Sequence, residues 1–426
     1  MIARHEIRAT CVLVALVMGC GQNAKNGVDS GIDMDLTPRC PTCQLLAVAP
    51  ALASANQTIN LEGTFADPVV VNFPGGISQS ATMLGPHRAT VIVPDTATTG
   101  DLTVTAGGSL VGPLAFRRVS FTPEIGSFQG YAGTTTARAQ PAIAAVGNRL
   151  YAIGGSDSVG ALTTIEEAII GADGSVGAFT ASSVGLTTGR IGARAKRIGD
   201  YLYVVGGADS VERAAVHADG SLGPFAALPD VHLLTARANL ALAVVGNYLY
   251  VMGGSAPETS TRVERAAIGV DGSLGAFEVV PDVTTAAGRV YFSAEVIGSY
   301  LYVLGGINIQ SQNSVERAKI AADGTLGRFE NAEGCTLSSG RDRVASVRIA
   351  GDLYAVGGQA PSAPFTIERA SIDASGTLGT FSLLTVHMST SHKDSTGVVI
   401  GDSLYVLGGL FGTASVERAP INAAPP

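Results

Sequence analysis

The chain has 426 residues and a mass of 43.1 kDa, enough for about two or three domains with sizeable cores. Only 15% of the residues are charged and the formal net charge is −8, so the sequence offers no basic surface for nucleic acid. Mean hydropathy is +0.31, yet beyond the first twenty residues no apolar run reaches the roughly 18 residues that span a bilayer. The hydrophobic residues are therefore expected in β-strands.

Residues 1–20 have the pattern of an export signal. Arg4 and Arg8 precede a short apolar run, and the stretch ends at Cys20. Its last four residues, Val-Met-Gly-Cys, resemble the lipobox of bacterial lipoproteins, in which the cysteine is lipidated and becomes the first residue. An ordinary cleaved signal is the alternative. The resemblance implies a protein of the bacterial cell envelope, anchored to the outer membrane only by lipid on Cys20 and facing the periplasm or the cell surface.

Residues 21–44 are polar, rich in glycine and without periodicity, so we expect a disordered tether. Cys40 and Cys43 form a single C-x-x-C pair in this segment. A zinc site would need a second pair or nearby histidines, so a local disulfide is the expected state in an exported protein. Cys335 is then left as a buried small residue or a free thiol.

Residues 45–118 consist of short β-rich runs broken by Gly, Pro and Asn, which predicts a small β-sandwich. The segment resembles the immunoglobulin-like IPT/TIG domain at residues 63–65, 90–94 and Pro113. That resemblance implies a spacer or an adhesion module. We expect the His87-Arg88 pair within it to lie in a solvated loop.

An internal repeat occupies the rest of the chain, residues 119–426. A Gly-Gly doublet follows an apolar Leu-Tyr strand six times, with first glycines Gly154, Gly206, Gly253, Gly305, Gly357 and Gly408. A period of about 50 residues with four short strands resembles the kelch type of β-propeller and implies six blades. The predicted fold class is therefore all-β, an immunoglobulin-like sandwich followed by a six-bladed propeller.

Each unit contains an inner strand, the doublet strand, a Val-Glu-Arg-Ala strand and an outer strand that opens with Leu-Gly-x-Phe. The last unit lacks the outer strand, but Ile-Gly-Ser-Phe at residues 125–128 repeats its opening. We therefore expect residues 119–131 to complete the sixth blade and close the ring. Kelch units carry tryptophan where this chain has phenylalanine.

Ligand-binding residues are expected in loops that differ between the units. They include His232, His387 and His392, of which the first lies about three units from the others, so no metal site is expected. Five arginines precede inner strands and would ring the channel mouth, where they would hold a carboxylate or phosphate: Arg138, Arg190, Arg237, Arg289 and Arg341. Their regular recurrence favours a structural role, as does the recurrence of the glutamates.

Two functional hypotheses follow. The first is a non-catalytic envelope lipoprotein that presents its propeller to a protein or a glycan, with no cofactor and no catalytic residue indicated. The second is a sugar-acting enzyme, because exported kelch propellers include a sialic-acid mutarotase, which would require a glutamate facing an arginine across the channel. A concave polar pocket that holds a carboxylate of perturbed pKa would favour the enzyme, and a flat apolar face would favour protein binding.

Overall fold

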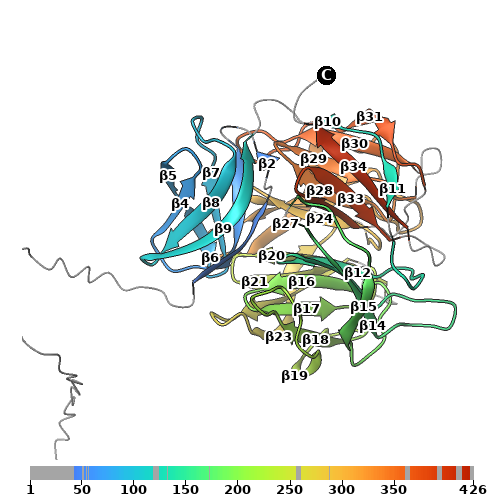
Figure 1. The fold of residues 1–426 in the computed structure, drawn as a ribbon. Coiled ribbons are helices and arrows are strands. Elements are labelled where there is room, and N and C mark those ends of the chain that lie inside the picture. Colours follow the sequence, from blue (N-terminus) through green and yellow to red (C-terminus); the bar gives the residue numbers. More distant parts are fainter. Residues whose placement is uncertain are drawn as a thin grey trace, which may run out of the picture. The chain divides into compact units, whose positions relative to one another are not determined.

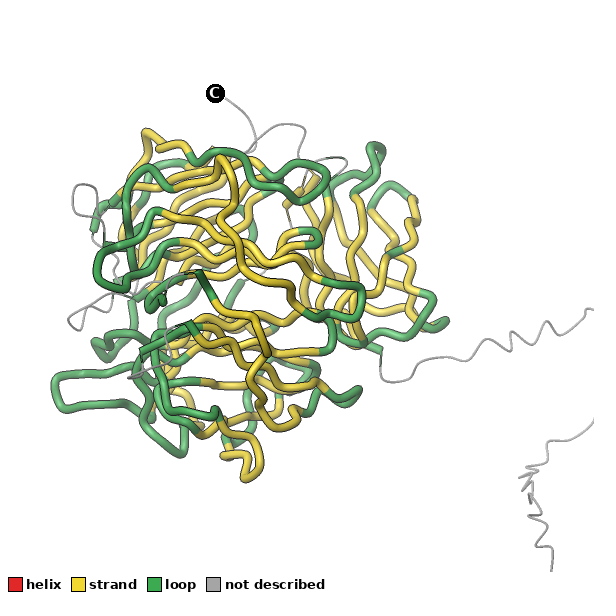
Figure 2. Tube along the Cα trace, turned by 180° about the vertical axis from the view of Figure 1, so that it is seen from behind, coloured by secondary structure: helices red, strands yellow, loops and turns green. Residues whose placement is uncertain are grey.

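The computed structural model describes residues 43–49, 52–53, 55, 57–118, 124–131, 133–171, 173–255, 261–286, 288–359, 365–390, 396–408 and 415–422. All regular elements in these residues are strands, as Figures 1 and 2 show, and the predicted all-β class is confirmed. They contain no helix of the length and apolar character that a membrane span requires. The chain divides into two units, Met1–Thr37 and Pro38–Pro426, and every described residue belongs to the second. The predicted export signal and most of the predicted tether lie outside the described residues.

The N-terminal domain, residues 44–118, contains two sheets that share one core. The first sheet consists, in spatial order, of β1 (Gln44–Ala49), β3 (Thr58–Thr64), β7 (Arg88–Ile92) and β6 (Thr82–Gly85). The second consists of β2 (Leu52–Ala53), β9 (Ser109–Arg118), β8 (Gly100–Ala106), β4 (Val69–Phe73) and β5 (Ile77–Ser80). Side chains alternate between buried and half-buried along β4, the pattern of a strand with one face on a core.

Six antiparallel sheets, numbered I to VI here, follow in the described residues. Sheet I contains β12 (Ala142–Val146), β13 (Arg149–Ile153), β14 (Thr164–Ile169) and β15 (Thr180–Gly185); sheet II contains β16 (Arg194–Ile198), β17 (Tyr201–Val205), β18 (Ser210–Ala215) and β19 (Ala226–His232). Sheet III contains β20 (Ala241–Val245), β21 (Tyr248–Met252), β22 (Arg262–Ile268) and β23 (Leu274–Thr284); sheet IV contains β24 (Ser293–Ile297), β25 (Tyr300–Leu304), β26 (Ser314–Ile320) and β27 (Leu326–Thr336). Sheet V contains β28 (Ala345–Ile349), β29 (Asp352–Val356), β30 (Thr366–Ser371) and β31 (Ser382–His387); sheet VI contains β10 (Glu124–Ile125), β11 (Gln129–Tyr131), β32 (Thr396–Ile400), β33 (Ser403–Leu407) and β34 (Val416–Asn422).

Sheet VI combines strands from both ends of the repeat region. Ile125 of β10 pairs with Ile421 of β34, and Gln129 of β11 pairs with Arg418 of the same strand. Figure 1 shows β10 and β11 beside β34, although they lie far apart in the sequence. Residues 124–131, which we expected to supply the missing outer strand of the last unit, therefore pair with β34, as an outer strand does in the other sheets.

Apolar side chains pack each sheet against the next. Six clusters of buried residues join I to II, II to III, III to IV, IV to V, V to VI, and VI back to I. Each cluster contains one phenylalanine from the Leu-Gly-x-Phe position or its variants: Phe225, Phe277, Phe329, Phe381, Phe128 and Phe179. The sheets thus form a propeller-like array in which an aromatic ring fills every seam.

The tyrosine of the Leu-Tyr strand and the Asp-Gly turn recur together because they form a hydrogen bond between neighbouring sheets. The hydroxyl of Tyr203 in sheet II donates to the carbonyl of Gly272, in the Asp-Gly turn of sheet III, over 2.7 Å. Tyr405 of sheet VI makes the same bond to Gly174 of sheet I at 3.2 Å. Because both groups are buried, each bond satisfies a hydroxyl and a carbonyl that would otherwise be unpaired.

Candidate functional site

The repeated arginines are buried and paired within their own sheets. Arg190 is 1% exposed, and its Nη2 lies 3.0 Å from Oε1 of Glu212, which is fully buried. Nη1 of Arg190 donates to the carbonyls of Gly206 and Ser210. The Glu212 carboxylate accepts a backbone hydrogen bond from Thr187 over 2.7 Å. The pair therefore fastens the incoming loop to the two central strands of its sheet.

Four further pairs repeat this arrangement: Arg138–Glu166, Arg237–Glu264, Arg289–Glu316 and Arg341–Glu368. None of the five arginines is more than 2% exposed, so none presents its guanidinium to a ligand in the channel. Their placement on the ligand face is corrected here. The arginines recur regularly because each of five sheets contains one such ion pair, which is the structural role that their recurrence indicated.

The two described histidines of the expected ligand face, His232 and His387, lie on different sheets. His232 and His387 are exposed on outer strands of sheets II and V. The Nε2 atom of His232 lies 2.6 Å from the carbonyl oxygen of Pro229, within its own strand. His392 lies outside the described residues. Over the part of the chain that the structure describes, no three His, Cys, Asp or Glu side chains come together as metal ligands.

The cysteines divide into two groups. Cys43 is disulfide-bonded, and its expected partner Cys40, like the predicted lipidation site Cys20, lies outside the described residues. Cys335 is free and 1% exposed. Burial raises the pKa of its thiol to about 11, so it is protonated and unreactive at neutral pH.

The N-terminal domain packs against the end of the sheets at which the first and second strands turn. Gly85 approaches the turn of sheet III so closely that an added Cβ would lie 2.4 Å from Oδ1 of Asn247. Glu62 of β3 forms an ion pair with Lys196 of β16, with 3.0 Å between oxygen and nitrogen. This domain therefore supplies side chains to the repeat region and does more than space it.

His87 and Arg88 are both only 7% exposed, so the expectation that they are solvated loop residues is wrong. The ring of His87 lies between the carbonyl oxygens of Gly63, 3.2 Å from Nδ1, and Gly269, 3.0 Å from Nε2. Nη1 of Arg88 donates to the carbonyl of Val244 in β20 over 2.7 Å. These contacts could not be predicted from the sequence near His87 and Arg88, because their partners Gly269 and Val244 belong to the repeat region.

The first strands of the sheets lie next to one another in turn, from β12 to β32. With the N-terminal domain, the first strands of sheets II to VI line a polar cavity of about 410 Å³, which we call the chamber. Its polar lining comes from both domains: Asn60, Glu62, Arg88, Lys196, Glu295, Ser346 and Arg348. These residues bring three cationic groups and two carboxyls to one cavity.

Both carboxyls of the chamber have partners. Glu62 is paired with Lys196, and Glu295 accepts a hydrogen bond from the hydroxyl of Ser346 over 2.7 Å. Burial raises the pKa of Glu295, and this effect exceeds the opposing effects of Ser346 and Arg348. Burial is the largest single influence on Glu62 as well, but the charges of Lys196 and Arg88, with the hydrogen bond from Lys196, together outweigh it and hold the pKa of Glu62 below its usual value.

The two arginines of the chamber meet at one amide. With its side-chain oxygen turned toward them, Asn60 accepts from Arg348 at 2.9 Å and from Arg88 at 3.2 Å. Nη2 of Arg348 donates to the backbone carbonyl of Thr58 at 3.3 Å. Burial lowers the pKa of Arg348 to about 10, although the charge of Glu295 opposes this.

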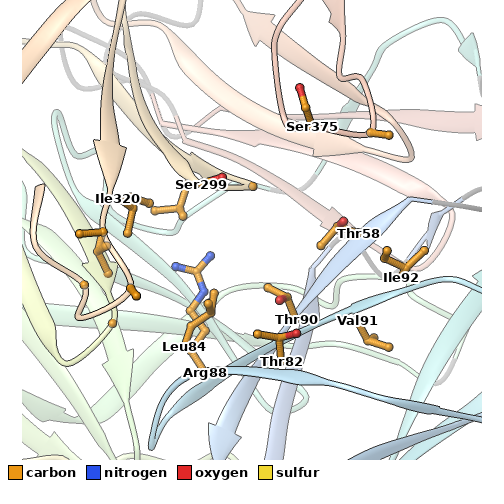
Figure 3. A pocket seen from close by; sticks show the side chains of 18 of the residues that line it. Thr58, Thr82, Leu84, Arg88, Thr90, Val91, Ile92, Ser299, Ile320 and Ser375 are labelled. Carbon is orange, nitrogen blue, oxygen red and sulfur yellow. The ribbon is translucent and has the colours of Figure 1, made fainter. Parts of the chain in front are cut away.

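A groove of about 750 Å³ adjoins the chamber, and Arg88 and Val296 line both. In Figure 3, Arg88 extends from the N-terminal domain toward the wall formed by Ser299 and Ile320. Part of the groove is apolar, with Leu84, Ile92 and Ile320 in its lining, and hydroxyl groups come from Thr58, Ser80, Thr82, Thr90, Ser299 and Ser375. The groove is therefore largely neutral and able to form hydrogen bonds, with one guanidinium at the boundary to the chamber.

The opposite end of the first strands carries a series of four backbone hydrogen bonds, here called the collar. Its members stand two positions after the repeated arginines and have φ between 54° and 65°: Gln140, Gly192, Asn239, Tyr291 and Arg343. From Gly192 on, each N–H donates to the carbonyl of the preceding member over 2.7 to 3.2 Å. The guanidinium of Arg343 stacks 3.8 Å from the ring centre of Tyr291. Four members carry side chains in a conformation that costs about 1 kcal/mol or more outside glycine.

Sequence reasoning missed the chamber, although a signal was available. At the third position of the first strand, sheets I and III have alanine while sheets II and IV have Lys196 and Glu295. At the fourth position, sheet V has Arg348 where sheets III, IV and VI have valine. Aligning the repeats by strand position would have shown charged residues at positions that are otherwise apolar.

Comparison with known proteins gives no further guidance. No model of a known protein family matches the chain. A search of curated proteins finds no relative with significant sequence similarity. The groove, the chamber and the predicted export signal are therefore the features that bear on function.

Proposed function

We propose that the protein is a lipid-anchored binding protein of the bacterial cell envelope, in which a six-bladed kelch-like propeller and an IPT/TIG-like domain together bind a glycan. In this proposal sheets I to VI are the blades, and Cys20 carries the lipid at the outer membrane. The observation that carries it is the hydroxyl-lined groove of about 750 Å³ that adjoins the charged chamber.

A glycan suits this site better than a protein surface does. Protein partners favour flat, apolar patches, whereas a concave site lined by hydroxyl groups and a few charged groups binds small polar molecules. The volume of the groove lies within the usual range for such ligands. Both domains contribute to its walls, with Thr82 and Thr90 on one side and Ser299 on the other.

Binding of the full-length chain to a panel of immobilised bacterial glycans tests this proposal. Ser299→Phe narrows the groove from an exposed turn, so it should abolish the binding without unfolding the protein. Ser382→Phe places the same side chain on the exposed outer strand β31 and should leave binding unchanged. Equal binding by both variants, or no binding to any glycan by the folded protein, would refute the groove as a glycan site.

The second candidate function, a sugar-acting enzyme such as a mutarotase, is favoured by one observation. Glu295 is a half-buried carboxyl with a raised pKa in the chamber that also holds Arg348, and perturbed carboxyls of this kind serve as general acids and bases. Interconversion of the anomers of N-acetylneuraminate, followed by magnetisation transfer in NMR spectra, tests it. Faster interconversion with the wild type, and loss of that acceleration in Glu295→Gln, would support catalysis. If the wild-type protein does not change the rate of interconversion, the protein binds the sugar without acting as a mutarotase.

A further inference from the structure

Among the described residues, no carboxylate lies within ion-pair distance of the two arginines of the chamber, although the charge of Glu295 acts on both of them and that of Glu62 acts on Arg88. Neither Arg88 nor Arg348 forms an ion pair there, whereas the arginines of the five repeated pairs each have their own glutamate. Nε of Arg88 and Nε of Arg348 are both buried without a hydrogen-bond partner. A largely buried cation that has no directly paired carboxylate is costly to keep, so two of them in one cavity require an explanation.

The arrangement of the two side chains supplies one. Both guanidinium groups converge on Asn60, whose oxygen is neutral and accepts from each of them. The charge of Arg88 acts against that of Arg348 and contributes to lowering the pKa of Arg348. Like charges held this close favour the entry of an anion, which would neutralise both and accept their hydrogen bonds.

The carboxyls of the chamber do not neutralise the positive charge of Arg88 and Arg348. Glu62 is engaged by Lys196, and Glu295 by Ser346. With all five ionisable groups charged, the chamber carries three positive and two negative charges, and protonation of Glu295 increases the excess. The side chains of Glu62 and Lys196 are 30% and 32% exposed, so solvent reaches the interior.

We propose that Arg88 and Arg348 form an anion-binding site that holds a carboxylate or phosphate group of the ligand. This inference rests on the proposed function, since it names the chemical class of the glycan: an acidic sugar or a phosphorylated one. The neutral part of the ligand lies in the groove, and its anionic group passes Arg88 into the chamber. Arg88 lines both cavities, as this path requires.

Isothermal titration of the full-length chain with inorganic phosphate and, separately, with acetate tests the site at constant ionic strength. We expect saturable binding of at least one anion with a stoichiometry near one, and the stronger of the two identifies the preferred group. Arg348→Gln should weaken it by about tenfold or more, since charged hydrogen bonds contribute about 1.5–3 kcal/mol each. The matched control Arg317→Gln removes the same charge from the partly exposed pair with Glu330 and should change nothing.

Glu295→Gln keeps the test decisive if an arginine variant fails to fold. It removes a negative charge from the chamber and should tighten anion binding severalfold, the opposite direction from Arg348→Gln. Binding that responds to neither variant, or that falls equally in Arg317→Gln, would mean an adventitious ion only and would overturn the proposal. Glycan binding by a protein that binds neither anion would overturn this inference alone and leave the proposed function standing.

Discussion

At the scale of single residues, glycine allows the turns of neighbouring sheets to touch. Gly246, with φ of 55°, ends the first strand of sheet III and faces Gly324 in the turn of sheet IV. A Cβ added to Gly246 would lie 2.7 Å from the Cα of Gly324, which is backbone and cannot rotate away. The same glycine-to-glycine contact recurs between the turns of other neighbouring sheets, as at Gly199 and Gly272.

Gly246→Ala should therefore destabilise the protein by about 2 kcal/mol or more, from the unfavourable φ and the clash together. Gly334→Ala is the matched control, because Gly334 has φ of 70° but an added Cβ would meet nothing within 4 Å. It should show only the conformational cost of about 1 kcal/mol. Urea unfolding of the two variants measures the difference, and equal losses would refute the role of the contact.

Glu295 gives the chamber a pH dependence whose sign can be stated. Its pKa is raised above the ordinary value of 4.5 by burial, although Ser346, Arg348, Lys196 and Arg88 all act against the shift. The folded state therefore binds this proton more tightly than the unfolded state does. The contribution of Glu295 to stability is full below about pH 4.5 and is lost as the pH rises through its folded pKa.

Glu295→Gln removes this ionisation and should raise the melting temperature at pH 7. At pH 4 the carboxyl is largely protonated in both states, so the variant and the wild type should melt at closely similar temperatures. Melting curves recorded by circular dichroism across this range supply the comparison. A lower melting temperature of the variant at pH 7 would show that the ionised carboxylate stabilises the chamber.

At the scale of the elements, buried ion pairs and exposed ones should behave differently. Arg190→Ala leaves the carboxylate of Glu212 buried without its cation, which costs about 3–5 kcal/mol. Arg265→Ala breaks a pair whose partner Glu278 is 60% exposed and should cost about 1 kcal/mol or less. Chemical denaturation of both variants tests this contrast, and similar losses would contradict the framework role of the buried pair.

The strands that complete sheet VI offer a second test at this scale. Deleting residues 124–131 removes β10 and β11, exposes the edge of β34 and takes Phe128 out of the seam between sheets V and VI. The melting temperature should fall sharply, with aggregation at the free edge. Deleting eight residues at positions 24–31, which precede the described residues, is the control. Equal stability of the two deletions would mean that the repeat array does not need this closure.

At the scale of the whole molecule, the N-terminal domain and the repeat region should unfold as one unit. Gly85→Ala forces a Cβ against Asn247 and should separate them, giving a second calorimetric transition and weaker anion binding. Gly76→Ala has a positive φ too, but its Cβ would meet nothing within 4 Å. A single transition in both variants would argue that the contact between the domains contributes little.

The sequence predicted the all-β, propeller-like array of sheets because its residues repeat. The doublets, the phenylalanines and the Val-Glu-Arg-Ala motif each recur, and a recurrent residue shows its structural role by its period. The candidate site could not be found in this way, since Asn60 and Arg88 occur once and meet Arg348 across the domain boundary. The five repeated arginines drew attention by their number, yet their regularity was the mark of a framework residue.

A crystal structure of the full-length chain with selenate would show whether Arg88 and Arg348 bind the anionic group of the ligand. Selenate is a tetrahedral dianion whose selenium can be located by anomalous scattering. We expect a selenium peak in the chamber, with oxygens within hydrogen-bond distance of both guanidinium groups. A chamber without selenate, in which Glu295 or another carboxylate has turned to pair with the two arginines, would contradict it.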